Sequence, residues 1–151
     1  RDFCLSRGLG DVYKRQKLHC TISIDCATIL NNLADLDPAK LDVLPTDGVV
    51  LNAVTVEFSE GESVFDVLQR VCRENNIHLE ATFTPGYNSA YVEGIHNLYE
   101  FDCGELSGWM YNVNGWFPNY GCSRYALQDG DVIRWRYTCD LGADVGGSMV
   151  A

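Results

Sequence analysis

Cysteine is the residue type whose number and spacing carry the most chemistry in this chain of 151 residues. Thiols form disulfides, bind zinc or act as nucleophiles, and their spacing favours one use over another. The sequence has no CxxC pair, and its histidines lie outside zinc-ligand spacing, which disfavours a metal site. The cysteines after residue 16 are even in number and lie at strand ends and in loops, which favours disulfides and an extracellular protein. These disulfide candidates are Cys20, Cys26, Cys72, Cys103, Cys122 and Cys139.

The alternative to disulfides is a set of reduced thiols in a cytosolic protein. Cys72 favours this alternative most, because it shares a predicted helix face with Phe65 and Leu68, where a free cysteine packs as a small hydrophobic side chain. Six cysteines can pair in many ways, and the sequence does not choose among them.

Enzyme motifs are absent from the sequence, which has no GxSxG, HExxH, Walker or GxGxxG pattern. His96 is the candidate general base, because Glu93 and Glu100 lie near it. Histidines near acids are common in loops, so we predict no catalytic residue and no enzyme. Two aspartate pairs would suit Ca²⁺ only if their oxygens converged with others, and turns are the simpler interpretation. They are Asp129 with Asp131 and Asp140 with Asp144. We expect no metal and no cofactor.

Aromatic side chains are concentrated in GWMYNVNGWFPNYG, residues 108–121. Asn114-Gly115 is a strong signal for a two-residue hairpin turn, with WF as the returning strand. Alternation along the hairpin then groups aromatic side chains on one face, and a second apolar stripe runs along residues 132–138. We predict that this face is buried and that four of these rings have a structural role: Trp109, Tyr111, Trp116 and Trp135. Cross-strand aromatic pairs of this kind stabilise a sheet by roughly 0.2–1 kcal/mol each.

The side chains left for recognition lie at the hairpin tip and in the tyrosine-rich loop 87–99. Phe117 points to the other face, and Tyr120 follows Pro118, so both are predicted to be exposed. A tyrosine ring is rigid and its hydroxyl still forms hydrogen bonds, which suits recognition. The predicted ligand-binding residues are Asn114, Gly115, Phe117, Asn119, Tyr120, Tyr87 and Tyr91.

One helix and several strands must position these residues. Ser63 and Asp66 form a capping-box pattern at the start of a helix at about 63–76, whose apolar residues recur at helical spacing. Strands are predicted from alternation at 20–25, 53–58, 77–83, 108–113 and 132–138, with Ile77, Leu79, Ala81 and Phe83 of the third facing the core. We therefore predict an α+β fold, in which the helix packs on a mixed or antiparallel sheet with a C-terminal aromatic hairpin.

The ends of the chain are predicted to lie outside this domain. Residues 1–16 resemble translated sequencing-adapter read-through from a metagenomic fragment, so we expect a non-native segment; a basic linker is the alternative. Residues 17–141 form the predicted domain. Residues 142–151 are rich in glycine and are predicted to be a linker to a missing region.

Charge and hydropathy exclude two classes of partner. The chain has 11 basic and 21 acidic residues and a net charge of −10, which repels phosphate backbones and anionic lipid heads. No apolar stretch approaches the roughly 18 residues that a membrane-spanning helix needs. We expect no nucleic acid partner and no membrane insertion.

Three segments carry a resemblance to a known family. GESVFDVLQR, GWMYNVNGWFPNYG and LQDGDVIRWRY, in this order, resemble the transcobalamin-like C-terminal domain family (DUF4430). This family is similar to the smaller, β-rich lobe of the vitamin B12 carriers transcobalamin and intrinsic factor. The resemblance covers residues 18 to 141 and implies a β-grasp-like fold on secreted or wall-attached bacterial proteins that often carry other modules.

The resemblance also implies a function. In the carriers the related lobe folds over one face of cobalamin, opposite a helical lobe that this sequence lacks. We therefore expect a non-catalytic extracellular or cell-surface binding module for a corrinoid, a glycan or a protein, within a larger multidomain surface protein. The alternative is a structural spacer or adhesin-stalk module that mediates protein or glycan contacts.

Overall fold

The computed structural model describes residues 17–84 and 89–147. Its larger sheet has the strand order β2-β1-β7-β6, and its smaller sheet has the order β3-β4-β5. The larger sheet consists of β1 (Leu18–Asp25), β2 (Val49–Phe58), β6 (Gly108–Val113) and β7 (Val132–Thr138). The smaller sheet consists of β3 (Leu79–Thr84), β4 (Ser89–Ile95) and β5 (Leu98–Tyr99). With helix α2 (Val64–Glu74), these elements confirm the α+β prediction.

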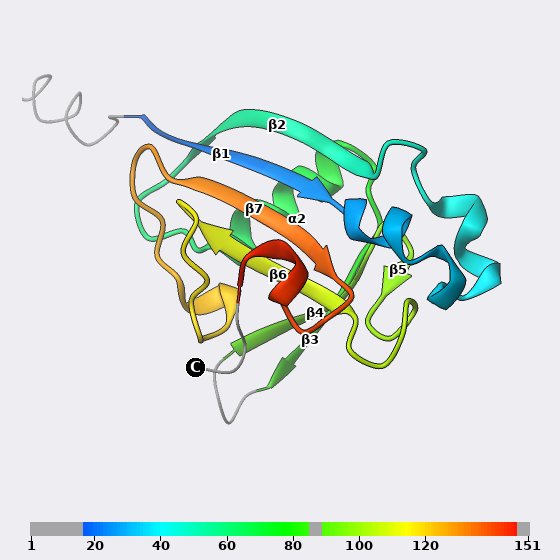
Figure 1. Cartoon of the computed structure of the whole chain (residues 1–151). Helices are drawn as coiled ribbons and strands as arrows, with labels where there is room; N and C mark the ends of the chain where they lie inside the picture. The colour runs from blue at the N-terminus through cyan, green and yellow to red at the C-terminus, as the bar shows by residue number, and fades with distance from the viewer. Residues whose placement is uncertain (1–16, 85–88, 148–151) are drawn as a thin grey trace, which may run out of the picture.

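The larger sheet is mixed, and one face of it carries the core. β1 pairs with β2 and β6 pairs with β7 in antiparallel fashion, while β1 and β7 run parallel at the centre. Alternation along β1 buries Ile22 and Ile24 completely, and alternation along β7 buries Ile133, Trp135 and Tyr137. These side chains pack against α2, which lies behind the sheet in Figure 1.

Helix α2 begins as its sequence predicts. The Ser63 hydroxyl accepts a hydrogen bond from the Asp66 amide (3.2 Å), and the Asp66 carboxylate accepts one from the Ser63 amide (2.9 Å). This reciprocal capping box satisfies amides that the first turn leaves unpaired. The helix ends at Glu74 with Asn75 as its C-cap, and Asn76 adopts the left-handed conformation with φ 55°. The buried face consists of Val64, Val67, Leu68, Val71 and Cys72.

The strand predicted at 77–83 is β3, and its last core assignment is wrong. Leu79 and Ala81 are partly buried, but Phe83 is 56% exposed. β3 is an edge strand of the smaller sheet, paired with β4 alone. Towards its end it extends beyond the core, so alternation along the strand no longer means burial.

The Asn114-Gly115 turn forms where the sequence predicts it. Val113 and Trp116 exchange both backbone hydrogen bonds (2.9 and 3.0 Å), and the two turn residues have φ values of 56° and 85°. The expected returning strand is limited to this single bridge, and the antiparallel partner of β6 is β7. The burial predicted for Trp116 is therefore wrong: its side chain is 54% exposed, beyond the end of the sheet.

Short 3₁₀ turns fill the connection between β1 and β2. They are η1 (Ala27–Asn31), η2 (Leu33–Asp35) and η3 (Pro38–Val43). Asp37 caps η3 by accepting the Ala39 amide at 3.0 Å, as expected for Asp before Pro38, but the turn is 3₁₀ rather than α. Figure 1 shows the turns gathered at the end of the sheet where β1 finishes.

The chain after β7 folds back onto the sheet. The turn η6 (Ala143–Val145) lies in front of β6 and β7 in Figure 1, and Val145 is buried. Asp144 accepts hydrogen bonds from the Thr138 hydroxyl and from the Cys139 amide (2.8 Å). Residues 142–147 of the predicted linker therefore pack on the domain. Residues 148–151, the segment 1–16 and Tyr87 lie outside the described residues. Within the described part of the chain, no helix is long and apolar enough to cross a membrane.

Candidate functional site

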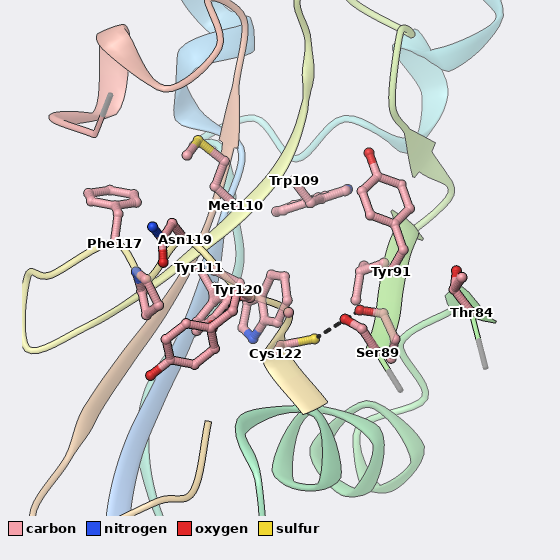
Figure 2. Close-up of a pocket in the computed structure, with 15 residues that line it drawn as sticks. Thr84, Ser89, Tyr91, Trp109, Met110, Tyr111, Phe117, Asn119, Tyr120 and Cys122 are labelled. Carbon is pink, nitrogen blue, oxygen red and sulfur yellow. Dashed lines mark hydrogen bonds between the residues drawn. The ribbon is translucent and has the colours of Figure 1, made fainter. Parts of the chain in front are cut away.

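A cavity of about 690 Å³ opens between β4, β6 and the segment 117–122. Figure 2 shows Phe117 and Tyr120 on one side, Tyr91, Ser89 and Thr84 on the other, and Trp109 and Tyr111 between them. Its volume lies within the range of about 300–1,000 Å³ that is typical of small-molecule sites. The described lining residues are Thr84, Ser89, Ala90, Tyr91, Val92, Trp109, Met110, Tyr111, Phe117, Pro118, Asn119, Tyr120, Gly121, Cys122 and Trp135.

The rings between the two walls are held in place by the core. The Trp109 indole donates to the Leu98 carbonyl (2.8 Å), and its ring meets the Tyr137 ring edge to face at 5.2 Å. The Tyr111 hydroxyl donates to the Tyr120 carbonyl (2.8 Å), and its ring lies 5.4 Å from that of Trp135. Rings fixed in this way are preorganised, so a ligand that packs on them does not bear the entropic cost of ordering them.

The wall formed by residues 117–122 approaches β4 closely because residue 121 is glycine. A Cβ on Gly121 would lie 1.8 Å from the Ser89 hydroxyl oxygen and 3.4 Å from the Ala90 carbonyl oxygen. The neighbouring Ser123 hydroxyl accepts the Ala90 amide at 2.9 Å. In this position Tyr120 remains 39% exposed while its backbone is anchored by Tyr111.

The wall formed by β4 presents hydroxyl groups. Tyr91 is 50% exposed, and its hydroxyl donates to Glu100 at 2.8 Å. Desolvation and the Glu100 carboxylate raise the pKa of Tyr91 to about 12, so the phenol stays protonated at neutral pH. With Ser89 and with Thr84 at the end of the neighbouring β3, this wall offers neutral groups that both donate and accept hydrogen bonds.

The cavity is electrically neutral along its described lining. None of these residues is an acid or a base, apart from the tyrosines and one thiol. Burial raises the pKa of Cys122 to about 12 and that of Tyr111 further, so both are uncharged at neutral pH. A site of aromatic faces with hydroxyl and amide groups suits a large neutral ligand that has an apolar surface and polar substituents.

Four predicted binding residues come together at this cavity: Tyr91, Phe117, Asn119 and Tyr120. Asn114 and Gly115 are not among its lining residues. Asn114 instead donates to Asp131 (3.0 Å) and accepts the Val132 amide (2.9 Å), which fixes the turn to the start of β7. Tyr87 lies outside the described residues.

Sequence reasoning missed several lining residues. Ser89, Met110 and Cys122 were not predicted, and Trp109 and Tyr111 were assigned to structure alone. Both rings are indeed buried, at 8% exposure each, yet their edges line the cavity. The sequence signal for this part of the cavity was the pair Pro118 and Gly121. Pro118 ends the hairpin, and Gly121 allows the chain to approach another strand closely.

The other candidate groups serve turns. His96 and Asn97 form the tight turn between β4 and β5, with φ values of 57° and 61°. Glu100, one of the acids expected beside His96, is the hydrogen-bond acceptor of Tyr91. Asp131 accepts the Gln128 amide (2.9 Å), as Asp144 accepts that of Cys139.

The cysteines from residue 20 onward are all free thiols in the structure. Cys20, Cys72 and Cys122 are buried in the core and belong to β1, α2 and the turn η5 (Cys122–Arg124), respectively. Cys26, Cys103 and Cys139 gather around the turn η1. Disulfide formation therefore stays a prediction. The thiols that the structure brings near one another are those of Cys26, Cys103 and Cys139.

Comparison with known proteins places the fold. The family model described as "Domain of unknown function (DUF4430)" matches residues 61–139, more than half of the chain. The chain belongs to this family. The resemblance that the sequence motifs carry is thereby confirmed. A search of curated proteins found no match for this DUF4430 chain.

Solved structures include two that resemble this DUF4430 domain. Haptocorrin in complex with Cbi matches with a TM-score of 0.56 and 14% identity, over 84% of this chain. The match covers 26% of the haptocorrin chain, so this protein corresponds to about a quarter of it. A protein from Ruminococcus gnavus, described as metal binding, matches with a TM-score of 0.46 and 15% identity, over 80% of this chain and 96% of its own. At these identities the haptocorrin match shows a shared fold.

Proposed function

We propose that this domain is a non-catalytic binding module that holds a corrinoid, outside the cell, in the cavity between β4, β6 and residues 117–122. The single observation that supports the proposal most is the cavity itself, which is preorganised, aromatic and neutral. The fold adds support, because haptocorrin, which shares it, was solved in complex with Cbi.

The chemistry of a corrinoid fits such a lining. The ligand is a large macrocycle with an apolar face and many carboxamide side chains. The ring edges of Trp109 and Tyr120 offer apolar contact, while Asn119 and Ser89 offer amide and hydroxyl partners for the carboxamides. A neutral lining also avoids the cost of burying unpaired charge against the ligand.

The domain is expected to cover only part of such a ligand. A corrinoid is larger than the drug-sized molecules that cavities of about 300–1,000 Å³ enclose, so the cavity would receive one face or edge of it. This chain corresponds to about a quarter of haptocorrin, and the rest of the haptocorrin chain lies outside the match. We expect the isolated domain to bind weakly, and the larger surface protein to supply the remaining contacts.

Titration of the purified domain with cobinamide and cobalamin, followed by calorimetry, tests this function. We expect saturable binding that Tyr120→Ala weakens roughly fivefold or more, because an aromatic contact is worth about 1 kcal/mol. The matched control is Phe101→Ala, since Phe101 is 63% exposed and is not among the lining residues. No binding of either corrinoid, or equal loss in both variants, would contradict the proposal.

A second candidate function is a spacer or adhesin module that contacts proteins or glycans. It is favoured by an aromatic cluster of the exposed Trp116 and Tyr120 with the partly buried Tyr125, whose ring centroids lie 6.2–6.4 Å apart. Exposed Trp and Tyr are enriched where proteins recognise partners. This candidate would replace the first if the domain bound a glycan panel or a surface protein through Trp116 and bound no corrinoid.

A further inference from the structure

Three of the six cysteines in the described part of the chain surround one short turn at the end of β1. Cys26 precedes η1 and is fully buried, with its amide bonded to the Gly48 carbonyl (2.7 Å). Cys103 is 98% buried, and Cys139 is half-buried at the end of β7. No residue of this cluster lines the proposed ligand cavity, so the cluster is a separate feature of the molecule.

Cys103 and Cys139 meet over η1. The Cys103 thiol lies 3.4 Å from the Asn32 carbonyl, and the Cys139 thiol lies 3.6 Å from the Thr28 hydroxyl oxygen. Asn32 and Thr28 are themselves joined by a hydrogen bond of 2.9 Å. The two sulfurs therefore contact atoms of the same turn, and each thiol lies close enough to the other to contribute to its pKa shift.

The chain segments that carry the two thiols are already held together. The Leu141 amide donates to the Leu106 carbonyl (3.0 Å), two residues beyond Cys139 and three beyond Cys103. The Tyr137 hydroxyl donates to the Tyr99 carbonyl (2.7 Å), just before both segments. A bond between the sulfurs would thus close a gap between segments that are fixed on both sides, with little backbone movement.

The two thiols differ in reactivity. Burial, with a smaller contribution from the nearby Cys139, raises the pKa of Cys103 to about 12. Burial also raises the pKa of Cys139, but its hydrogen bond with Thr28 and the neighbouring Cys103 thiol act in the opposite direction. Cys139 is also the more exposed of the two. Since the thiolate is the nucleophile, Cys139 is the thiol that reacts first with an external disulfide.

We propose that Cys103 and Cys139 form a single disulfide when the protein meets a small-molecule disulfide oxidant such as oxidised glutathione. Cys139 loses its proton and attacks one glutathione sulfur, which releases glutathione thiolate and leaves a mixed disulfide on Cys139. Cys103 then loses its proton and attacks the Cys139 sulfur, which releases the second glutathione. The protein gives up two electrons and two protons, and one oxidised glutathione becomes two reduced glutathiones. The disulfide joins the 100–107 loop to the end of β7.

Peptide mapping of the full chain tests the pairing. The reduced protein is treated with oxidised glutathione, remaining thiols are alkylated, and the chain is cut without reduction by trypsin and a Glu-specific protease. Cleavage after Glu100, Glu105 and Arg136 releases Cys103 in residues 101–105 and Cys139 in residues 137–151. We expect these two peptides to be linked, while Cys20, Cys72 and Cys122 are recovered alkylated.

Two variants complete the test. Cys103→Ser should leave Cys139 as a stable mixed disulfide with glutathione, because the resolving thiol is gone. The control Cys72→Ser removes a buried thiol of α2 and should leave the link between 101–105 and 137–151 unchanged. Linkage of Cys139 to the peptide that contains Cys26, or full alkylation of Cys103 and Cys139 in the treated wild-type protein, would overturn the proposal. The peptide map of the wild-type protein shows whether Cys103 and Cys139 are linked even if a variant fails to fold.

Discussion

Gly48 shows how one residue holds the end of the larger sheet in place. Its φ of +73° lies in the left-handed region, and its carbonyl accepts the Cys26 amide at 2.7 Å. A Cβ at this position would lie 2.6 Å from the Ala27 Cα, a backbone atom that cannot rotate away. The turn η1 and the thiols around it therefore depend on the absence of a side chain at residue 48.

Gly48→Ala is expected to lower the free energy of unfolding by about 1–3 kcal/mol, through overpacking and backbone strain. Urea denaturation followed by tryptophan fluorescence measures this change. Gly108→Ala is the matched control, because the nearest neighbour of its added Cβ lies at 3.5 Å, an ordinary contact. Equal stability of the two variants would show that the turn tolerates a side chain.

Local sequence patterns predicted individual residues well where the decisive contact was local. The Asn114-Gly115 turn needs only two residues with positive φ, so the dipeptide sufficed. The burial of Trp116 depended instead on whether a strand followed it. The chain leaves the sheet after one bridge, and the alternation of apolar and polar residues does not predict where a strand ends.

Among the helices and strands, helix α2 was the most directly predictable from the sequence. Its start was predictable because the capping box and the apolar spacing lie within one continuous segment. The smaller sheet was harder to predict, because β3 and β4 pair with each other and not with the larger sheet. The sequence of an edge strand does not indicate which strand it pairs with. The cavity has the same origin: residues 117–122 meet β4 across about thirty positions of sequence, and only the folded chain brings them together.

Ser63→Ala is expected to lower the free energy of unfolding by about 1 kcal/mol, because the Asp66 amide loses its acceptor. Thermal and urea unfolding measure the change. Ser59→Ala is the control, as it makes the same substitution at an exposed residue four positions earlier, where the backbone amide and carbonyl form the described hydrogen bonds and the side chain forms none. A loss in Ser59→Ala as large as that in Ser63→Ala would contradict the role of the capping box.

Over the whole molecule, a strongly acidic chain surrounds a cavity lining and buried thiols that carry no charge. The chain carries a net charge of −10, yet the described cavity lining is neutral. The thiols and phenols of the interior are likewise held in their protonated forms. Burial raises the pKa of Cys20 and Cys72 from 9.0 to about 11 and that of Cys26 to about 12.

Stability is therefore expected to fall at alkaline pH. In the unfolded chain these thiols ionise near pH 9, whereas in the folded chain they keep their protons until about pH 11–12. Over that interval the unfolded state binds fewer protons, so the stabilisation is present below pH 9 and is lost as the pH rises. Urea midpoints at pH 7, 9 and 10.5 on the reduced protein measure it. A midpoint that stays constant or rises over this series would contradict the expectation.

The central claim is that the cavity between β4, β6 and residues 117–122 binds a corrinoid. A ¹H–¹⁵N spectrum of the domain, recorded during titration with cobinamide, tests it most directly. We predict saturable changes concentrated at residues 89–92, 109–111 and 117–122, including the indole signal of Trp109, with little change along β2. An unchanged spectrum, or changes confined to surfaces outside the cavity, would contradict the claim.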